Sequence, residues 1–263
     1  MLEHFEAALG GLTGDRLGLV LDFDGTLSEF VPDLDKAVIS CDVVPPLLGL
    51  ARKLTLTAAM SGRAARDLEQ RVGIDGLVYI GNHGAERILD GALSVAEEAE
   101  SSESDLQALL ERLGSAANDP GIVLENKAYS ASLHYRRASD EAGVKERLRS
   151  ALGDIPKSED LEFFWGNKIL EIRRRNGVNK GIALDRVIRD WQLDVVIFAG
   201  DDTTDADALR VLQQRKAPGD VDGLGIAVIQ DGTPSSVLDN ADYSLNGVSE
   251  VATFLSRLDA AIG

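Results

Sequence analysis

The stretch LVLDFDGTLSEF, residues 19–30, decides how the fold of this chain is interpreted. An apolar run ends at two acidic residues, Asp22 and Asp24, and Gly25-Thr26 then breaks it. A short apolar run bounded by turn residues is typical of a buried strand. Two carboxylates at the end of such a strand repel each other and are costly to desolvate, which indicates a chemical function.

The composition narrows the class of protein. Lys and Arg number 27 against 44 Asp and Glu, and this net charge of −17 disfavours a nucleic-acid partner. Cys41 is the only cysteine, which excludes an intrachain disulfide and a cysteine-rich zinc site. The acidic start lacks the pattern of a signal peptide, and no run approaches the ~20 apolar residues of a membrane span. We therefore expect a cytoplasmic protein without a membrane partner.

Short apolar runs alternate with helical patterns along most of the chain, which is typical of βα units and a parallel sheet. The expected strands are 17–21, 54–60, 77–80, 195–199 and 225–229, and the expected helices are 64–72, 181–191, 205–214 and 249–261.

The middle of the chain has a different pattern. Strand signals in IVLENK (122–127), YSASLHYR (129–136) and KILEIR (168–173) surround two expected helices, 101–117 and 140–152. We therefore predict an α/β fold. A Rossmann-like parallel-sheet core comprises residues 1–86 and 176–263, and a smaller α+β domain is inserted at residues 87–175.

Four polar clusters lie where elements of the predicted core begin or end. Ligands of an open parallel sheet bind beyond the carboxyl ends of its strands, so these clusters can converge there. Each one alone also fits a turn or a helix cap, but all four together in this order favour a site. The clusters are Asp22-Phe23-Asp24-Gly25-Thr26, Ser61-Gly62-Arg63, Asn179-Lys180-Gly181 and Gly200-Asp201-Asp202-Thr203-Thr204-Asp205.

These residue types suit phosphoryl transfer. Asp22 can attack phosphorus and form an aspartyl-phosphate, and Asp22 with Asp201 can hold Mg²⁺. Ser61, with backbone N–H groups at a helix start, makes an anion cradle, and Lys180 supplies a point charge. Asp24 would protonate the leaving alkoxide and later activate water, because two close acids can divide into such roles.

The four motifs in this order resemble the phosphatases of the haloacid dehalogenase (HAD) superfamily. The position of the insert, between Ser61 and Lys180, resembles the subgroup with an α/β cap of the C2 type. The resemblance implies catalytic Asp22, Asp24 and Lys180, and Mg²⁺ held by Asp22, Asp201 and the backbone carbonyl of Asp24. The remaining implied residues are Ser61, Gly62 and Lys180 for phosphate, with Asp202 and Asp205 supporting the metal site.

A narrower resemblance is to the trehalose-6-phosphate phosphatases. It rests on GNHGAE (81–86), ENK (125–127), LHYR (133–136), GNKILEIR (166–173) and NKG (179–181). The implied sugar contacts are Lys127, His134, Arg136 and Glu171, with Glu86 at the domain junction. Strand alternation puts Asn167, Ile169, Glu171 and Arg173 on one face, which suits a sugar or a solvent-facing strand side.

The chain departs from that family's pattern at three positions. Arg174 stands where the family usually has Pro, and Asn167 where it often has Lys. Ala206 stands where the family usually has Glu. None of the three belongs to the predicted catalytic core.

The sequence thus predicts a Mg²⁺-dependent phosphatase that hydrolyses trehalose 6-phosphate, with a trehalose-6-phosphate synthase as a functional partner. The closest alternative is the same chemistry on another sugar phosphate, such as sucrose 6-phosphate or mannosyl-3-phosphoglycerate. An alternative of another class is a non-catalytic regulatory module.

Overall fold

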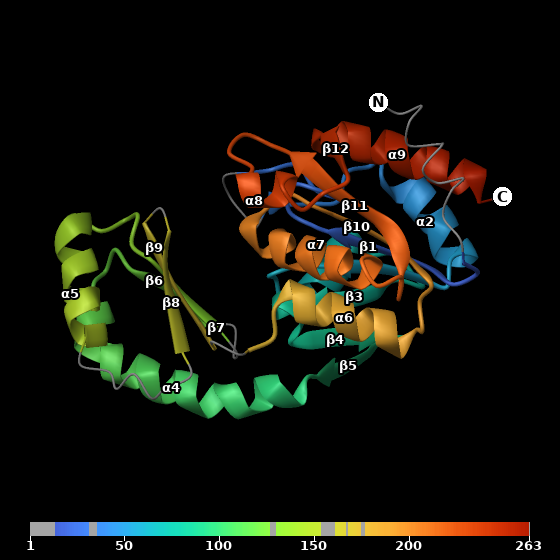
Figure 1. Ribbon diagram of the computed structural model, residues 1–263. Helices are drawn as coiled ribbons and strands as arrows, with labels where there is room; N and C mark the ends of the chain where they lie inside the picture. The colour runs from blue at the N-terminus through green and yellow to red at the C-terminus, as the bar shows by residue number, and fades with distance from the viewer. Residues whose placement is uncertain are drawn as a thin grey trace. The chain divides into compact units, whose positions relative to one another are not determined.

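The computed structural model describes residues 14–31, 36–126, 130–153, 161–166, 168–174 and 177–262. The chain divides into two compact units, which are seen in Figure 1. Met1–Ser94 and Asn179–Gly263 form the core unit, and Val95–Val178 form the cap unit.

An eight-stranded sheet forms the centre of the core unit, in the order β12-β11-β10-β1-β2-β3-β4-β5. Neighbouring strands from β12 to β3 run parallel, and β4 is antiparallel to β3. The predicted parallel sheet is therefore confirmed. The strands are β1 (Leu17–Asp22), β2 (Leu56–Met60), β3 (Val78–Gly81), β4 (Glu86–Leu89), β5 (Ala92–Val95), β10 (Val195–Gly200), β11 (Asp222–Ile229) and β12 (Tyr243–Asn246).

The unit boundaries differ from the predicted limits of 86/87 and 175/176. The first boundary follows Ser94 because β4 and β5 extend the core sheet beyond β3. The second boundary precedes Asn179, the N-cap residue of the next core helix.

Helices cover both faces of the core sheet. Alternation along β1 sends Leu19 and Leu21 into one hydrophobic cluster and Val20 into another. The first cluster includes side chains of α2 (Val44–Lys53), α3 (Ala65–Val72) and α9 (Gly247–Ala261). The second includes side chains of α6 (Lys180–Asp190), α7 (Thr203–Lys216) and the short α8 (Ser235–Leu238). Because both faces are covered, the strands are almost continuously apolar.

The strand order reverses at β1. From β1 the chain adds β2 and β3 on one side, and it later adds β10, β11 and β12 on the other. Helix-linked strands that wind away in opposite directions leave a crevice at the carboxyl ends of the two central strands. In this sheet, that position lies between β1 and β10.

The cap unit has its own sheet and hydrophobic core. Its antiparallel strands follow the order β6-β7-β9-β8, and Leu133, Leu170 and Ile172 are buried in a cluster with side chains of both helices. The elements are α4 (Glu97–Ala117), β6 (Val123–Asn126), β7 (Ser130–His134), α5 (Glu141–Gly153), β8 (Leu161–Gly166) and β9 (Ile169–Arg174). The predicted helices and the pairing of β6 with β7 are present.

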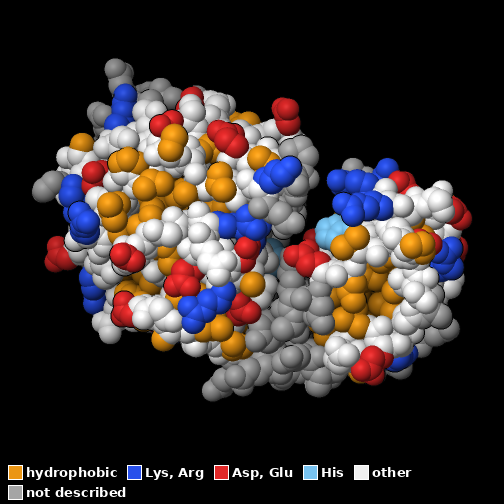
Figure 2. All heavy atoms as spheres, turned by 180° about the vertical axis from the view of Figure 1, so that it is seen from behind, with side chains coloured by type: hydrophobic (Ala, Val, Ile, Leu, Met, Phe, Trp, Pro, Cys, Tyr) orange, Lys and Arg blue, Asp and Glu red, His pale blue; other side chains and the backbone are white. Residues whose placement is uncertain are grey.

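The exposed surface of the core unit carries charges of both signs. On the face seen in Figure 2, Asp and Glu side chains are interspersed with Lys and Arg, so the acidic excess does not form one patch there. Within the described ranges, no helix combines the length and the apolar character needed to cross a membrane.

Candidate active site

The predicted catalytic motifs meet at the reversal point of the core sheet. Asp22 is the last residue of β1, and the register pairs it with Met60, directly before Ser61. On the other side of β1, Leu21 pairs with Ala199 of β10, which ends just before Asp201. Parallel pairing thus brings segments that are far apart in the sequence to the carboxyl ends of the central strands.

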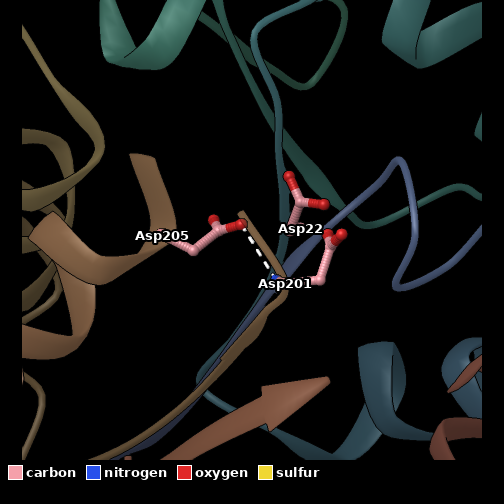
Figure 3. Close-up of side chains that lie close together, drawn as sticks. All are labelled: Asp22, Asp201 and Asp205. Atoms are coloured by element: carbon pink, nitrogen blue, oxygen red, sulfur yellow. Dashed lines mark hydrogen bonds between the residues drawn. The ribbon is translucent and has the colours of Figure 1, made fainter. Parts of the chain in front are cut away.

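Three carboxylates gather at this edge, as Figure 3 shows. One carboxylate oxygen from each of Asp22, Asp201 and Asp205 lies within 4.8 Å of the other two. Asp205 is fully buried in the first turn of α7, and its Oδ2 accepts the backbone N–H groups of Asp201 (3.1 Å) and Asp202 (3.0 Å). These bonds fix Asp205 in the cluster.

The segment GDDTTD folds in this way because it forms a capping box. Asp202 is the N-cap residue of α7, and its Oδ1 accepts the backbone N–H groups of Thr204 (2.8 Å) and Asp205 (3.0 Å). The Asp205 side chain completes the box by accepting from the Asp202 backbone. The side chain of Asp202 is therefore directed to the helix end.

Lys180 joins two of the three carboxylates. Its Nζ donates to Asp22 Oδ1 at 2.5 Å and to Asp205 Oδ1 at 2.6 Å, and its side chain is buried. Lys180 is the first residue of α6, and the N-cap residue Asn179 accepts the N–H of Ile182 at 2.9 Å. The helix start thus holds the lysine stem in place beneath the sheet edge.

Burial and charge shift the pKa values of these groups. Burial raises the pKa of Asp22 and outweighs the opposing effect of Lys180. Burial and the nearby charge of Asp205 raise the pKa of Asp201 to about 7. Burial alone would lower the pKa of Lys180, but Asp205 and Asp22 together raise it well above its usual value. The Lys180 ammonium group is thus hydrogen-bonded to two of the three clustered carboxylates, those of Asp22 and Asp205.

The residues at this edge fit a divalent cation. Asp201 Oδ1 is buried and accepts no hydrogen bond among the described residues. Gly25 lies at φ +84°, and a Cβ there would approach Asp201 Oδ2 to 2.6 Å, so glycine leaves space at this carboxylate. Clustered carboxylate oxygens are the ligands that hard divalent cations prefer. A bound cation would neutralise excess negative charge and polarise a phosphoryl oxygen.

The Asp24 carboxylate is not one of the three that gather. Its Oδ2 accepts Arg63 Nε at 2.8 Å, and its Oδ1 accepts Arg63 Nη2 at 2.7 Å. In the sequence, Arg63 belongs to a predicted polar cluster, but no role is predicted for it. The available signal was an Arg just after one expected strand and an Asp just after another, although only the observed β1–β2 pairing makes them neighbours.

Ser61 and Gly62 follow β2 as predicted, and the next helix begins within one residue of the predicted start at residue 64. The buried Ser61 accepts the Arg63 N–H on its Oγ at 3.1 Å, and α3 begins at Ala65. The N–H of Ala65 donates to Glu86 Oε2 at 2.7 Å. The first amide of α3 is thus engaged by Glu86, and the phosphate cradle expected at Ser61 stays a prediction.

Glu86 belongs to the framework of the core unit. Besides capping Ala65, it accepts Asn82 Nδ2 on Oε1 at 2.8 Å. Asn82 and His83 adopt positive φ angles of 48° and 55°, and a Cβ on Gly62 would approach the His83 ring to 2.6 Å. Glu86 thereby ties this turn, β4 and the start of α3 together, a structural role that the sequence analysis did not anticipate.

The cap unit presents two of the predicted sugar contacts on one sheet face. Ser132 pairs with Glu171, and His134 lies two residues along the same strand, so His134 and Glu171 share a face. Glu171 is exposed, and His134 Nε2 lies 3.4 Å from Glu125 Oε2. Arg136 is exposed just beyond β7. Lys127 and Asn167 lie outside the described residues.

The departure at Ala206 has a simple structural context. Ala206 is buried on α7 within the second hydrophobic cluster of the core unit. The side chain at this position therefore packs against the sheet and not at the carboxylate cluster.

The two units and their sheet topologies define the class of this protein as one with a HAD-like fold and an additional α+β unit. A haloacid dehalogenase-like hydrolase from Bacteroides thetaiotaomicron shares the fold with a TM-score of 0.68 and 16% identity, covering 93% of this chain and 100% of its own. The C-terminal domain of Candida albicans trehalose-6-phosphate phosphatase has a TM-score of 0.74 and 22% identity, and the match covers 94% of each chain. The C-terminal domain of the Candida albicans trehalose synthase regulatory protein has a TM-score of 0.69 and 13% identity, and the match covers 97% of each chain.

The sequence comparisons define the family. The family model for trehalose-phosphatase matches residues 20–249, so the chain belongs to the trehalose-phosphatase family and is a phosphatase. Trehalose-phosphate phosphatase B of Arabidopsis thaliana is 29% identical over 98% of this chain and 70% of its own length. Trehalose-phosphate phosphatase of Mycobacterium marinum is 33% identical over 94% of this chain and 63% of its own length.

Proposed function

We propose that this protein hydrolyses trehalose 6-phosphate to trehalose and phosphate with the help of Mg²⁺. The observation that carries the proposal is the cluster of Asp22, Asp201 and Asp205 around Lys180, at the strand ends of a chain that belongs to the trehalose-phosphatase family. A trehalose-6-phosphate synthase would be its functional partner, because it would supply the substrate. The expected cytoplasmic location stays a prediction.

Asp22 is the proposed nucleophile. Its carboxylate would attack phosphorus, the sugar alkoxide would leave with the electrons of the broken P–O bond, and an aspartyl-phosphate would remain. Lys180 lies 2.5 Å from Asp22 Oδ1, where its ammonium can stabilise the negative charge of the incoming phosphoryl group. The buried Ser61 and the half-buried Gly62, which follow the neighbouring strand, are the proposed phosphate-binding residues.

Among the three clustered carboxylates, Asp201 is best placed to bind Mg²⁺ directly with Asp22. Asp201 Oδ1 accepts no hydrogen bond among the described residues, whereas Asp205 uses one oxygen for Lys180 and the other for two backbone N–H groups. Asp205 therefore supports the site by orienting its neighbours, and Asp202 supports it by capping α7. The backbone carbonyl of Asp24 is the further proposed ligand.

Asp24 is the proposed general acid and base. It would give a proton to the leaving alkoxide and then take one from the water that attacks the aspartyl-phosphate. Over the full cycle Asp24 returns to its starting state, and one water is consumed. Lys127, His134, Arg136 and Glu171 are the proposed sugar contacts, since they would supply hydrogen-bonding groups for sugar hydroxyls.

The test is phosphate release from trehalose 6-phosphate, sucrose 6-phosphate, mannosyl-3-phosphoglycerate and glucose 6-phosphate at equal concentration. Each is assayed with Mg²⁺ and with a chelator. A strong, metal-dependent preference for trehalose 6-phosphate is expected. A preference for another substrate would overturn the trehalose assignment and keep the phosphatase. No release from any of the four would favour the regulatory module, whose fold the Candida albicans regulatory domain shares.

A further inference from the structure

Arg63 holds both oxygens of Asp24 at once. Its Nε and Nη2 donate to the two carboxylate oxygens at 2.8 and 2.7 Å. This two-pronged arrangement fixes the plane and direction of a carboxylate, which a single hydrogen bond or a lysine cannot do. Each oxygen accepts one bond from Arg63 and retains a further lone pair for another partner.

The guanidinium of Arg63 is itself fixed from several sides. Its side chain is 12% exposed, its backbone N–H binds Ser61 Oγ, and its Cζ lies 5.6 Å from the centre of the Phe23 ring. Its Nη1 donates to Asp67 Oδ2 at 3.3 Å. Arg63 therefore connects the first motif, the second motif and the first turn of α3.

The charges continue along α3. Asp67 Oδ2 also accepts Arg71 Nε at 2.8 Å, and Arg71 Nη1 donates to the backbone oxygen of Ala37 at 2.8 Å. Asp24, Arg63, Asp67 and Arg71 thus alternate in sign in an unbroken chain. Such a chain restrains Arg63 from the side opposite Asp24.

In this arrangement the guanidinium nitrogens of Arg63 donate to protein carboxylates and not to a substrate phosphate. Three of its nitrogens, Nε, Nη1 and Nη2, donate to the carboxylates of Asp24 and Asp67. The positive charge next to the second motif is thereby committed to protein groups. Lys180 remains the cation at the nucleophile.

We propose that Arg63 is a positioning residue, which fixes the Asp24 carboxyl group so that both of its proton transfers take place at one defined position. This inference rests on the proposed role of Asp24 in the reaction described above. In the first transfer the alkoxide takes the proton of the Asp24 carboxyl group. In the second, the Asp24 carboxylate takes a proton from the attacking water.

The test compares substrates that differ in their need for a proton. A sugar alkoxide is a poor leaving group and needs protonation, whereas the p-nitrophenolate of p-nitrophenyl phosphate leaves without it. The quantity kcat/KM reports the steps up to the departure of the leaving group. It therefore depends on the first proton transfer, from Asp24 to the alkoxide, and not on the second, from water to Asp24. The variants are Arg63→Gln, Arg63→Lys and Asp67→Asn. The matched control is Arg66→Gln, a nearby arginine of α3 that forms an exposed ion pair with Glu69.

We expect Arg63→Gln to lower kcat/KM for trehalose 6-phosphate about 10- to 100-fold, because a misplaced catalytic group can lose that much. The value for p-nitrophenyl phosphate should change less than about threefold, and KM for trehalose 6-phosphate should change little. Arg63→Lys should show most of the same loss in kcat/KM, since lysine keeps the positive charge but cannot donate to both carboxylate oxygens in the fixed geometry of a guanidinium group. Asp67→Asn should show a smaller loss of the same kind, and Arg66→Gln none.

An equal loss on both substrates would overturn the proposal and assign Arg63 to phosphate binding or to the fold. An unchanged kcat/KM for trehalose 6-phosphate would overturn it as well. If Arg63→Gln does not fold, as judged by circular dichroism, Arg63→Lys and Asp67→Asn decide the question with the same substrates.

A series of aryl phosphates with leaving groups of graded acidity separates this proposal from the proposed substrate. If the wild type hydrolyses the aryl phosphates but not trehalose 6-phosphate, the proposed substrate is wrong, and the proposed role of Arg63 can still be tested with the aryl series. In that case, a steeper dependence on leaving-group acidity in Arg63→Gln than in wild type would still support positioning. An unchanged dependence would overturn it. Asp24→Asn is the reference, because it should show the steepest dependence of all.

Discussion

The core unit and the cap unit hold their polar groups in opposite ways. In the core unit, Asp22, Lys180 and Asp205 are buried and linked by hydrogen bonds of 2.5 and 2.6 Å. In the cap unit, His134 and Glu171 lie on a partly exposed sheet face, and His134 Nε2 lies 3.4 Å from Glu125 Oε2. The first arrangement permits little movement, whereas the second leaves side chains able to adapt to a ligand.

This difference suggests that the core unit carries out the chemistry and that the cap unit selects the substrate. Buried, paired charges are pre-organised and act strongly because water does not screen them. Exposed side chains on a sheet face contribute little to folding and can change without disturbing the framework. We therefore expect substitutions in the core unit to abolish chemistry or stability, and substitutions in the cap unit to change the choice of substrate.

The largest effect is expected for Asp22→Asn. The amide keeps the size of the side chain but removes the nucleophile, so phosphate release should fall by at least about 10³-fold. Release is measured with trehalose 6-phosphate and p-nitrophenyl phosphate, and circular dichroism checks the fold. Activity close to that of wild type would contradict the role of Asp22.

The second effect concerns stability. Lys180→Gln leaves the buried carboxylates of Asp22 and Asp205 without their cation, so the free energy of unfolding should fall by about 3–5 kcal/mol. Urea denaturation measures this loss. Lys216→Gln is the control, because Lys216 pairs with the partly exposed Asp242. Equal losses in the two variants would show that the buried ion pairs of Lys180 contribute no more to the free energy of unfolding than the partly exposed pair of Lys216.

Metal binding should stabilise the folded core unit of the wild type. A cation that binds only the folded state adds about 2.7 kcal/mol at 100 times its Kd. Mg²⁺ should therefore raise the melting temperature of the wild type, and a chelator should reverse the effect. Asp201→Asn should remove most of this response, whereas Asp239→Asn, outside the carboxylate cluster, should keep it. A full response in Asp201→Asn would exclude Asp201 as a ligand.

In the cap unit, Glu171→Gln and His134→Ala should lower kcat/KM for trehalose 6-phosphate about tenfold each. Removing one hydrogen bond from a charged group to a ligand has an effect of this size. Their effect on p-nitrophenyl phosphate should stay within about twofold, and the free energy of unfolding should change by less than about 0.5 kcal/mol. Glu146→Gln, on the exposed side of α5, is the control. Equal losses on both substrates would contradict the division between the units.

The smallest effect is expected at Asp242, which lies outside the catalytic motifs. Burial alone would raise its pKa, but hydrogen bonds from Lys216, the Gly225 N–H and Gln213 lower it below 3.8. Its stabilising contribution is therefore complete above pH 3.8 and is lost as the pH falls through the lower folded-state pKa. Asp242→Asn should cost about 1 kcal/mol at pH 7, less at pH 3, and leave activity unchanged. An equal loss at both pH values would contradict this assignment.

The sequence predicts the core elements well because their signals are local. The expected strands 17–21 and 195–199 differ from β1 and β10 by one residue each, since a continuous apolar run defines a doubly covered strand. The helix α2 was not predicted, because Pro45 and Pro46 disfavour a helix interior although they are tolerated in the first turn, where they lie.

Other features depend on contacts that no local pattern encodes. Residues 87–94, which include most of β4 and β5, are assigned to the inserted domain by the sequence prediction, because the chain order does not reveal which sheet a segment joins. The pairing of Arg63 with Asp24 needs the register of β1 and β2. Likewise, Asp205 was predicted only to support the metal site, and the capping box places its carboxylate directly beside Asp22 and Asp201.

Trapping the aspartyl-phosphate intermediate would test the proposed role of Asp22 directly. The enzyme is mixed with trehalose 6-phosphate labelled on its phosphoryl group, quenched in acid within the first turnover, digested and mapped by mass spectrometry. We expect labelled phosphate on the peptide that contains Asp22, and none in Asp22→Asn. Label on another residue, or rapid turnover without any labelled peptide in the wild type, would contradict it.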